Sequence, residues 1–254
     1  MPRSLTAPAD AALAAHRSCG LPASRRPEAA RNHLRYGRIV PDMPTITELD
    51  RHPAPATRPQ PLAFLNGLLW AGSWDTDAIY AIDAADWKVR EHVAAPGKPY
   101  GMTAFGDELR VVVALDDDDR YLYRFVPGRG FDPASKVACP DFTGSYLAAG
   151  EATVFLGQMG KRRILALNED SQPLREIALP TRCAGFGFGP HGHFFMISGD
   201  DELEHLKFGT LDVSQDAPEF EEIAPIDDNA RSLVYDGRRW WTSLRDENQI
   251  ASFT

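Results

Sequence analysis

The feature that most constrains this chain is a repeat of about 42 residues. Five turn glycines, each followed by a short apolar or aromatic run, are spaced by 39, 44, 42 and 45 residues: Gly67, Gly106, Gly150, Gly192 and Gly237. A second apolar run begins 12 to 15 residues after each glycine. Two landmarks that recur together in five copies indicate one supersecondary unit that stacks on its neighbours to bury its apolar faces.

Each copy has the pattern of four short strands joined by tight turns. The runs are four to six residues long and rich in Val, Ile, Phe, Tyr and Trp, and Asp-Gly or Gly-Asp stands at the tight connections. Four antiparallel strands per 40–45 residues is typical of a blade of a β-propeller. Residues 43–254 provide room for five such copies. The sequence therefore predicts an all-β fold, a five-bladed β-propeller over 43–254.

The last copy ends after its third strand, so one strand is missing at the C-terminus. The strand-like segment 45–49 has no place in the other blades. We expect an N-terminal strand near 44–50 to pair with the C-terminal strand and close the ring, because closure removes the exposed edges of an open sheet.

Residues 1–42 differ from the predicted domain in charge. They contain seven Arg and three acidic residues, a balance of +4, whereas the whole chain has a net charge of −9. A disordered tail, an over-extended start and a targeting peptide all fit this composition. This segment therefore takes no part in the predicted fold.

Composition excludes several classes of function. The acidic balance argues against nucleic-acid binding through bulk charge, and no stretch of about 18 apolar residues is present to cross a membrane. The three Cys show no CxxC spacing, which leaves no disulfide framework and no zinc motif. A cytoplasmic location is the expectation, and the oligomeric state stays open.

Two segments resemble known propeller enzymes. Residues 65–83, LNGLLWAGSWDTDAIYAID, resemble a segment of the plant- and bacterial-type glutamine cyclotransferases, which are five-bladed propellers that close N-terminal glutamine into pyroglutamate. Residues 98–103, KPYGMT, are similar to the same family and equally to streptogramin-lyase-like, NHL and lactonase propellers. The resemblance implies a small-molecule enzyme. However, the glutamate of the cyclotransferase T-E-G-L motif is missing from all five inner strand starts.

In a propeller, the starts of the inner strands meet at one mouth of the central channel, which is the usual place for a ligand. The repeat places three cations there, Lys98, Arg182 and Arg231, with Tyr100 and Tyr146 beside them. Guanidinium groups suit a carboxylate or a phosphate. We therefore expect an anionic small-molecule ligand, and salt bridges to acidic loops are the alternative.

The loops between the second and third strands are acidic in four copies. Clustered carboxylates suit Ca²⁺, and Asn229 is a candidate ligand of the lactonase type. Solvated turns are the alternative, so no cofactor is certain and Ca²⁺ stays open. Trp74, in one of these loops, is either a stacking wall for a ligand or packed on the next blade.

Two functions remain open. The first is an enzyme of the cyclotransferase, lactonase or lyase group acting on a carboxylate-bearing substrate. Tyr100 is then the candidate acid, Asp75 the candidate base, and the substrate-binding residues are Arg182, Arg231, Lys98, Tyr146, Trp74 and Asn229. The second is a non-catalytic propeller that binds a ligand or a protein.

Overall fold

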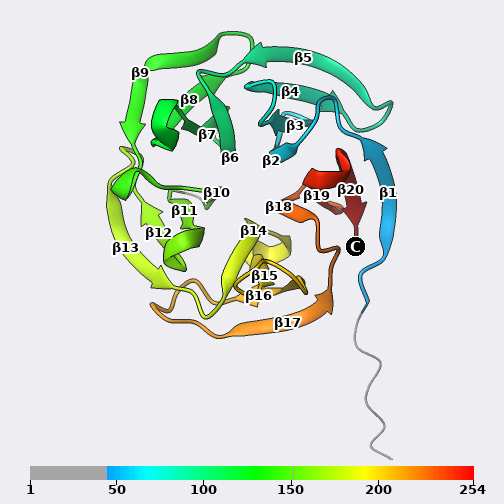
Figure 1. The fold of residues 1–254 in the computed structure, drawn as a ribbon, viewed down its shortest axis with the longest axis vertical. Coiled ribbons are helices and arrows are strands. Elements are labelled where there is room, and N and C mark those ends of the chain that lie inside the picture. The colour runs from blue at the N-terminus through cyan, green and yellow to red at the C-terminus, as the bar shows by residue number, and fades with distance from the viewer. Residues whose placement is uncertain (1–44, 151) are drawn as a thin grey trace, which may run out of the picture. The chain divides into compact units, whose positions relative to one another are not determined.

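Five four-stranded antiparallel sheets stand around a common axis like the blades of a propeller (Figure 1). The computed structural model describes residues 45–150 and 152–254. Within this range the fold is all-β, which confirms the predicted five-bladed propeller. The alternatives for residues 1–42 lie outside the described residues.

The first blade contains β2 (Pro59–Leu65), β3 (Leu68–Ser73), β4 (Ala78–Asp83) and β5 (Lys88–Ala94). The second contains β6 (Lys98–Phe105), β7 (Glu108–Ala114), β8 (Arg120–Val126) and β9 (Gly130–Ala138). The third contains β10 (Tyr146–Ala149), β11 (Val154–Gln158), β12 (Arg163–Leu167) and β13 (Pro173–Ala178).

The fourth blade contains β14 (Arg182–Phe188), β15 (Phe194–Gly199), β16 (Lys207–Leu211) and β17 (Phe220–Pro225). The fifth contains β18 (Ala230–Tyr235), β19 (Trp240–Leu244), β20 (Gln249–Phe253) and β1 (Glu48–Pro53). Short 3₁₀ turns connect some of the strands: η1 (Asp116–Asp118), η2 (Pro140–Phe142), η3 (Met159–Lys161), η4 (Pro190–Gly192) and η5 (Arg245–Glu247).

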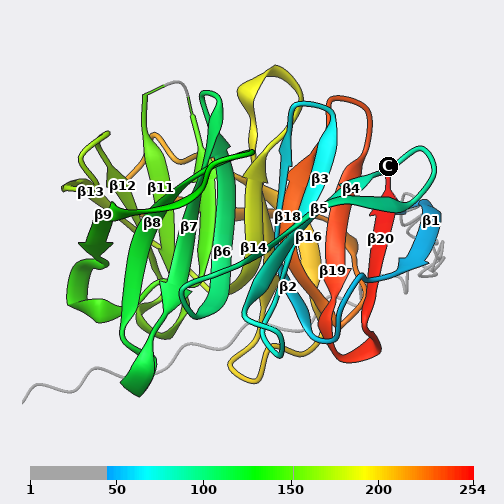
Figure 2. The ribbon, with the colours of Figure 1, turned by 90° about the horizontal axis from the view of Figure 1, so that it is seen from above.

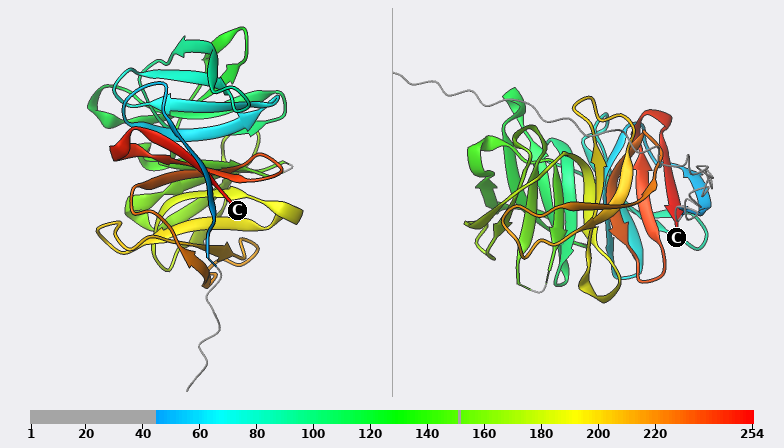
Figure 3. Two further views of the ribbon diagram at one scale, coloured as in Figure 1. Left: turned by 90° about the vertical axis from the view of Figure 1, so that its right-hand side faces the viewer. Right: turned by 90° about the horizontal axis from the view of Figure 1, so that it is seen from below.

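The N-terminal strand closes the ring as expected, although it lies a few residues later than 45–49. β1 pairs antiparallel with β20, with Arg51 opposite Ala251, and the two strands run side by side in Figure 3. The backbones of Thr47 and Thr254 also exchange two hydrogen bonds of 3.0 Å. The outer strand of the fifth blade is therefore supplied by the opposite end of the domain, which leaves no gap in the ring.

The inner strands β2, β6, β10, β14 and β18 surround the axis and run along it (Figure 2). Two glycines let neighbouring inner strands touch through their backbones. A Cβ on Gly101 would lie 3.0 Å from the carbonyl oxygen of Ser145, and one on Gly185 would lie 2.7 Å from the carbonyl carbon of Ser232. Side chains larger than hydrogen would push these strands apart, so the glycines keep the axis narrow.

Apolar side chains between neighbouring blades form the core. The fully buried Trp70 of the first blade meets Phe125 of the second, with ring centroids 5.1 Å apart. On β19, Trp240 packs on Phe195 of the fourth blade, and the next residue, Trp241, stacks on Trp87 of the first. Adjacent residues of a strand point to opposite faces, so these two indoles attach the fifth blade to both of its neighbours.

Candidate functional site

The starts of the inner strands form one end of the channel, which we call the mouth. Each start lies beside the end of the second strand of its blade: Lys98 is opposite Ala114, Arg182 opposite Gly199, and Ala230 opposite Leu244. The loops that follow the second strands therefore stand at the same end. This is the arrangement that the repeat predicted.

Irregular pairing near the starts aims several side chains at the mouth. Register shifts interrupt β2 between Pro59 and Leu62, β6 between Pro99 and Gly101, β14 between Cys183 and Gly185, and β18 between Arg231 and Val234. A bulge adds a residue to one strand and turns its side chain away from the regular alternation. In β6 the residue inside the shift is Tyr100.

Trp74 is the centre of an aromatic and cationic cluster at the mouth. Its ring lies 4.6 Å from that of Tyr100 in the second blade, so Trp74 does pack on the next blade. Three cations surround the indole: Arg58 at 5.2 Å, Lys98 at 6.0 Å and Arg245 at 4.8 Å from the ring centroid. The indole Nε1 is buried and has no hydrogen-bond partner among the described residues.

Arg120, which the sequence analysis missed, holds Tyr100 in place. Its guanidinium carbon lies 3.7 Å from the centroid of the Tyr100 ring, and its Nη1 donates to the carbonyl oxygen of Gly144 at 2.6 Å. The Tyr100 hydroxyl donates to Asp118 at 3.1 Å. Burial raises the pKa of Tyr100, and the charge of Arg120 opposes that shift.

Arg231 is the most buried cation of the mouth, with 7% of its surface exposed. Its Nη1 donates to the carbonyl oxygens of Asp228 at 3.0 Å and Ala230 at 2.7 Å. Its Nε is buried and has no partner in the described part of the chain. Burial lowers the pKa of Arg231, because a desolvated cation is disfavoured.

Arg182 stands in the fourth blade beside an acidic loop. Its Nε lies 3.9 Å from Asp201, too far for a hydrogen bond, and this buried Nε also lacks a partner within residues 45–150 and 152–254. Asp201 is instead bound by Arg162 of the third blade. The basic third loop thus neutralises an acidic neighbour and leaves the Arg182 N–H free.

Tyr146 lies deeper than Tyr100, and 5% of its surface is exposed. Burial raises its pKa to about 12, opposed by the charges of Arg231 and Arg245. Cys183 lies nearby, and burial raises the pKa of its thiol to about 12 as well. A thiol that stays protonated is a poor nucleophile, so Cys183 is a packing residue.

The remaining two predicted residues stand on the rim. Asn229 donates from Nδ2 to Glu247 at 2.9 Å. Asp75 is exposed and accepts a hydrogen bond of 2.8 Å from Thr57, with Arg58 at 3.9 Å. The structure thus groups Trp74, Tyr100 and Lys98 in one cluster. Tyr146 packs with Cys183 in the core, Arg231 binds backbone carbonyls, and Arg182, Asn229 and Asp75 contact acidic or polar neighbours.

Charges at the mouth are layered, with cations inside and carboxylates outside. The side chains of Arg120 and Arg245 are 15% and 20% exposed, whereas those of their partners Asp118 and Asp246 are 59% and 58% exposed. Buried charges are screened less by water than exposed ones. The inner part of the mouth is therefore electropositive, although the protein as a whole is acidic.

The acidic loops do not gather into a metal centre in the part of the chain that the structure describes. No group of three or more His, Cys, Asp or Glu side chains is placed there to hold a metal ion. The carboxylates face neighbouring cations instead, as Asp75 and Asp118 do.

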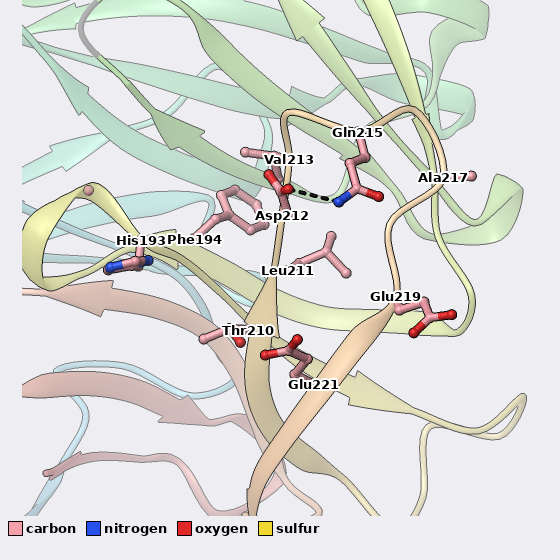
Figure 4. A pocket seen from close by; sticks show the side chains of 11 residues that line it. His193, Phe194, Thr210, Leu211, Asp212, Val213, Gln215, Ala217, Glu219 and Glu221 are labelled. Atoms are coloured by element: carbon pink, nitrogen blue, oxygen red, sulfur yellow. Dashed lines mark hydrogen bonds between the residues drawn. The ribbon is translucent and has the colours of Figure 1, made fainter.

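The structure has two large clefts, one beside the mouth and one far from it. One, of about 510 Å³, lies beside it and is lined by Lys98, Tyr100 and Asp118 among others. The other, of about 620 Å³, lies on the fourth blade at the opposite end of the strands (Figure 4). Its lining includes Asp212, Glu219 and Glu221 and contains no Lys or Arg, so it would repel an anion.

The fold and the mouth together define a five-bladed propeller with an electropositive, aromatic-lined end to its channel. No protein family and no curated protein matches the chain. Solved structures do match. Glutaminyl cyclase from Myxococcus xanthus has a TM-score of 0.64 and 8% identity, covering 83% of this chain and 96% of that chain.

Two further solved structures are similar at lower scores. A streptogramin B lyase has a TM-score of 0.51 and 10% identity, covering 82% of this chain and 97% of that chain. Hydrazine synthase from Kuenenia stuttgartiensis has a TM-score of 0.51 and 16% identity, covering 75% of this chain and 56% of that chain. The chain is thus a propeller that resembles glutaminyl cyclases and streptogramin lyases. Identities this low show the fold alone, and their names cover different activities.

Among the described residues, no helix has the length and apolar character that a membrane crossing requires.

Proposed function

We propose that the protein is a small-molecule enzyme of the broad cyclotransferase, lactonase and lyase-like propeller group, and that it acts on a carboxylate-bearing ligand at the mouth. The observation that carries this proposal is a set of three buried N–H donors at the mouth, on Trp74, Arg182 and Arg231, which have no partner among the described residues. The fourth such donor, on Trp70, lies in the apolar core. A buried donor left unpaired costs about 1–3 kcal/mol. A bound carboxylate would supply the missing acceptors.

The three donors come from the first, fourth and fifth blades, which are neighbours around the ring. Arg182 and Arg231 are the proposed carboxylate ligands, because a guanidinium N–H to a carboxylate is a strong, charge-assisted hydrogen bond. Lys98 adds positive charge beside the Trp74 ring. Tyr146 and Asn229 complete the proposed substrate-binding set.

Tyr100 and Asp75 are the proposed acid and base. Tyr100 is half-buried, is held by Arg120 and borders the cleft beside the mouth. Asp75 is an exposed carboxylate in the loop that contains Trp74. A carboxylate can accept a proton and a phenol can donate one, so the two side chains offer the two roles that general acid–base catalysis requires.

A second candidate is a non-catalytic propeller that binds a ligand or a protein. It is favoured by the hydrogen bonds that already engage both proposed catalytic groups: the Tyr100 hydroxyl donates to Asp118, and Asp75 accepts from Thr57. In this case the carboxylate binds at the mouth but is not converted.

A thermal melt of the full chain with a panel of small carboxylates, lactones and N-terminal-Gln peptides tests the proposal. A ligand at 100 times its Kd adds about 2.7 kcal/mol of stability, so carboxylates are expected to raise the Tm. Arg182→Gln should weaken that shift. Arg175→Gln is the matched control, because its side chain is 34% exposed against 35% for Arg182 and it also faces an Asp.

Product analysis of the ligands that bind separates the two candidates. Conversion of a bound ligand supports the enzyme, and binding without conversion by the pure protein supports the non-catalytic propeller. A Tm that no carboxylate moves would overturn both forms of the anionic-ligand proposal. A Tm that rises with Ca²⁺ and falls back with EDTA would show that the acidic loops hold a metal.

A further inference from the structure

Three side chains of the second blade meet at the cleft beside the mouth. Tyr100 is on β6, Asp118 is in η1 and Arg120 begins β8. Tyr100 and Asp118 line the cleft of about 510 Å³, and Arg120 contacts both of them. The phenol of Tyr100 therefore has an acidic and a basic neighbour at the edge of a cavity that can hold a small ligand.

Arg120 is fixed against one face of the Tyr100 ring. Its guanidinium carbon lies 3.7 Å from the ring centroid, and its side chain is 15% exposed. Its Nη1 donates to the carbonyl oxygen of Gly144 at 2.6 Å and to Oγ of Ser145 at 3.1 Å, just before inner strand β10. A guanidinium does not lose its proton in a protein, so a permanent positive charge lies against the phenol.

Asp118 joins the other two side chains. The Tyr100 hydroxyl donates to its Oδ1 at 3.1 Å, and Nη2 of Arg120 donates to its Oδ2 at 3.3 Å. An isolated carboxylate would hold the phenol proton in place, because its negative charge disfavours a phenolate beside it. The guanidinium on the second oxygen offsets that charge, so Asp118 can orient the hydroxyl without trapping its proton.

The effects on the Tyr100 proton have a clear order. Burial raises the pKa of Tyr100 most, the charge of Arg120 is the largest effect that lowers it, and Asp118 acts in the same direction as burial. The other charged side chains around Tyr100 line the same cleft or lie on the ring of Trp74: Lys98, Asp77, Asp116, Arg58 and Arg245. Arg120 thus opposes both of the influences that keep the phenol protonated.

We propose that Arg120 is a positioning residue that enables Tyr100 to act as the acid, because it fixes the phenol ring and stabilises the phenolate that forms when the proton leaves. This role rests on the proposed function, in which Tyr100 is the acid. In the transfer, the O–H bond of the phenol breaks, its electron pair stays on the phenolate oxygen, and the proton binds to a basic atom of the ligand. A proton from the solvent then restores the phenol.

The first test measures the ionisation of Tyr100 in the free, full-length protein. NMR of the chain labelled at the hydroxyl-bearing ring carbon of tyrosine follows each phenol, and the signal of Tyr100 is the one that Tyr100→Phe removes. Arg120→Met keeps much of the bulk and removes the charge, so it should raise the pKa of Tyr100 by about 1 or more. Arg120→Lys keeps the charge without the planar fork and should recover part of that difference.

Asp118→Asn is the second variant, because it removes the negative charge beside the hydroxyl at a side chain that is 59% exposed. It should lower the pKa of Tyr100, the opposite direction to the loss of the guanidinium. Arg110→Met is the matched control. Arg110 is on β7 of the same blade, is 11% exposed, pairs with Glu108 at 2.9 Å and lies 5.3 Å from the ring centroid of Phe105. Its loss should leave the pKa of Tyr100 unchanged.

The second test uses any carboxylate of the thermal-melt panel that the wild type converts. Tyr100→Phe should lower kcat about 100-fold, as expected for loss of a general acid. Arg120→Met should lower kcat about 10-fold and leave KM within about threefold, because the guanidinium stabilises the phenolate that forms during the transfer and not the bound ligand. Arg120→Lys should recover part of kcat.

The outcomes separate the role of Arg120 from the proposed function. If Arg120→Met is folded and the pKa of Tyr100 equals that of the wild type, the role of Arg120 is wrong, while conversion of a carboxylate still supports the enzyme. If Arg120→Met does not fold, Arg120→Lys and Asp118→Asn decide, and an unmoved pKa in both overturns the role. If the wild type converts no ligand, the proposed enzyme fails and the role of Arg120 fails with it.

Discussion

The same five inner strands build both ends of the channel, yet the two ends differ in chemistry. At the mouth the strand starts are bulged and present Gln60, Tyr100 and Arg231. At the far end a cavity of about 150 Å³ is lined mostly by apolar side chains from all five strands, among them Leu62, Met102, Leu147, Phe188 and Leu233. Within a few residues, an inner strand thus changes from polar side chains at the mouth to packed apolar side chains at the far end.

Because of this difference, we expect side chains at the far end to serve stability and side chains at the mouth to serve binding. At the far end the strands pair regularly, and buried apolar groups contribute stability in proportion to the area they remove from water. At the mouth the interrupted pairing and the unpaired N–H groups reduce stability, as is common where a protein binds a ligand. Variants at the two ends should therefore differ in what they damage.

The largest expected effect is on stability at the far end. Leu62, which is 2% exposed and lies in a buried apolar cluster, is the residue to change. Leu62→Ala should destabilise the domain by about 2–5 kcal/mol, because it removes buried methyl groups and leaves a cavity. Chemical denaturation measures the loss. The affinity for a small carboxylate of the thermal-melt panel should stay within twofold of the wild type. A parallel loss of affinity would show that stability at the far end and binding at the mouth depend on each other.

Arg231→Met should damage both properties at the mouth. It removes the donor to the carbonyls of Asp228 and Ala230 and the free Nε, so we expect a loss of about 1–3 kcal/mol together with loss of carboxylate binding. Arg231→Lys keeps the charge and should recover part of the stability. A variant of normal stability that no longer binds would show that Arg231 serves the ligand alone.

The repeat made the fold predictable, and the outer strands mark where the prediction loses accuracy. The turn glycines located the blades because tight hairpins favour them, and Gly67, Gly106, Gly192 and Gly237 have positive φ. Asn66 and Gly67 have φ of 53° and 78°, as a type I′ turn requires. The closing strand was placed at 45–49 but extends from Glu48 to Pro53. Its residues are mostly exposed and mostly polar, and its position is set by pairing with β20 and by ion pairs of Arg51 with Glu48, Asp227 and Glu247.

The mouth was predictable where it depended on strand starts and not where it depended on contacts between blades. Lys98 and Arg231 follow from the repeat alone. Arg120 begins a third strand directly after an acidic run, and its contact with Tyr100 arises only when the second blade folds. The same holds for Arg245 and Gln60, which are 185 residues apart and meet where the ring closes. Pairs of this kind leave no local pattern in the sequence.

A rise in pH should lower the stability of the folded protein, because it ionises Tyr146. Its pKa of about 12 in the folded protein lies above the ordinary value near 10. The folded protein therefore holds this proton more tightly than the unfolded chain, and the resulting stability is complete below about pH 10 and is lost as the pH rises toward 12. We expect a loss of about 3 kcal/mol from this group.

The buried thiols of Cys139 and Cys183 act in the same direction. Their pKa values of about 12 lie above the ordinary value of 9.0, so their contribution begins to fall at a lower pH than that of Tyr146. Denaturation at about pH 8, 10 and 11 measures the sum. Tyr146→Phe should lessen the decline above about pH 10, and an equally steep decline in that variant would contradict the assignment.

The smallest effect on stability is expected at the rim, where Lys98 tests the long-range charge of the mouth. No salt bridge of its amine is found in the described part of the chain, and the amine lies 6.0 Å from the Trp74 ring centroid. Lys98→Met should leave stability within about 0.5 kcal/mol and weaken binding of a carboxylate about threefold at low salt. The difference should shrink as salt is added, because a rim charge acts on the ligand through screened electrostatics.

Lys136→Met is the matched control. Lys136 lies on an outer strand, 4.0 Å from the ring centroid of Tyr121, so it has the same kind of aromatic contact away from the mouth. If both variants weaken binding equally, the effect comes from the net charge of the protein, and the mouth attracts its ligand no more than the rest of the surface does.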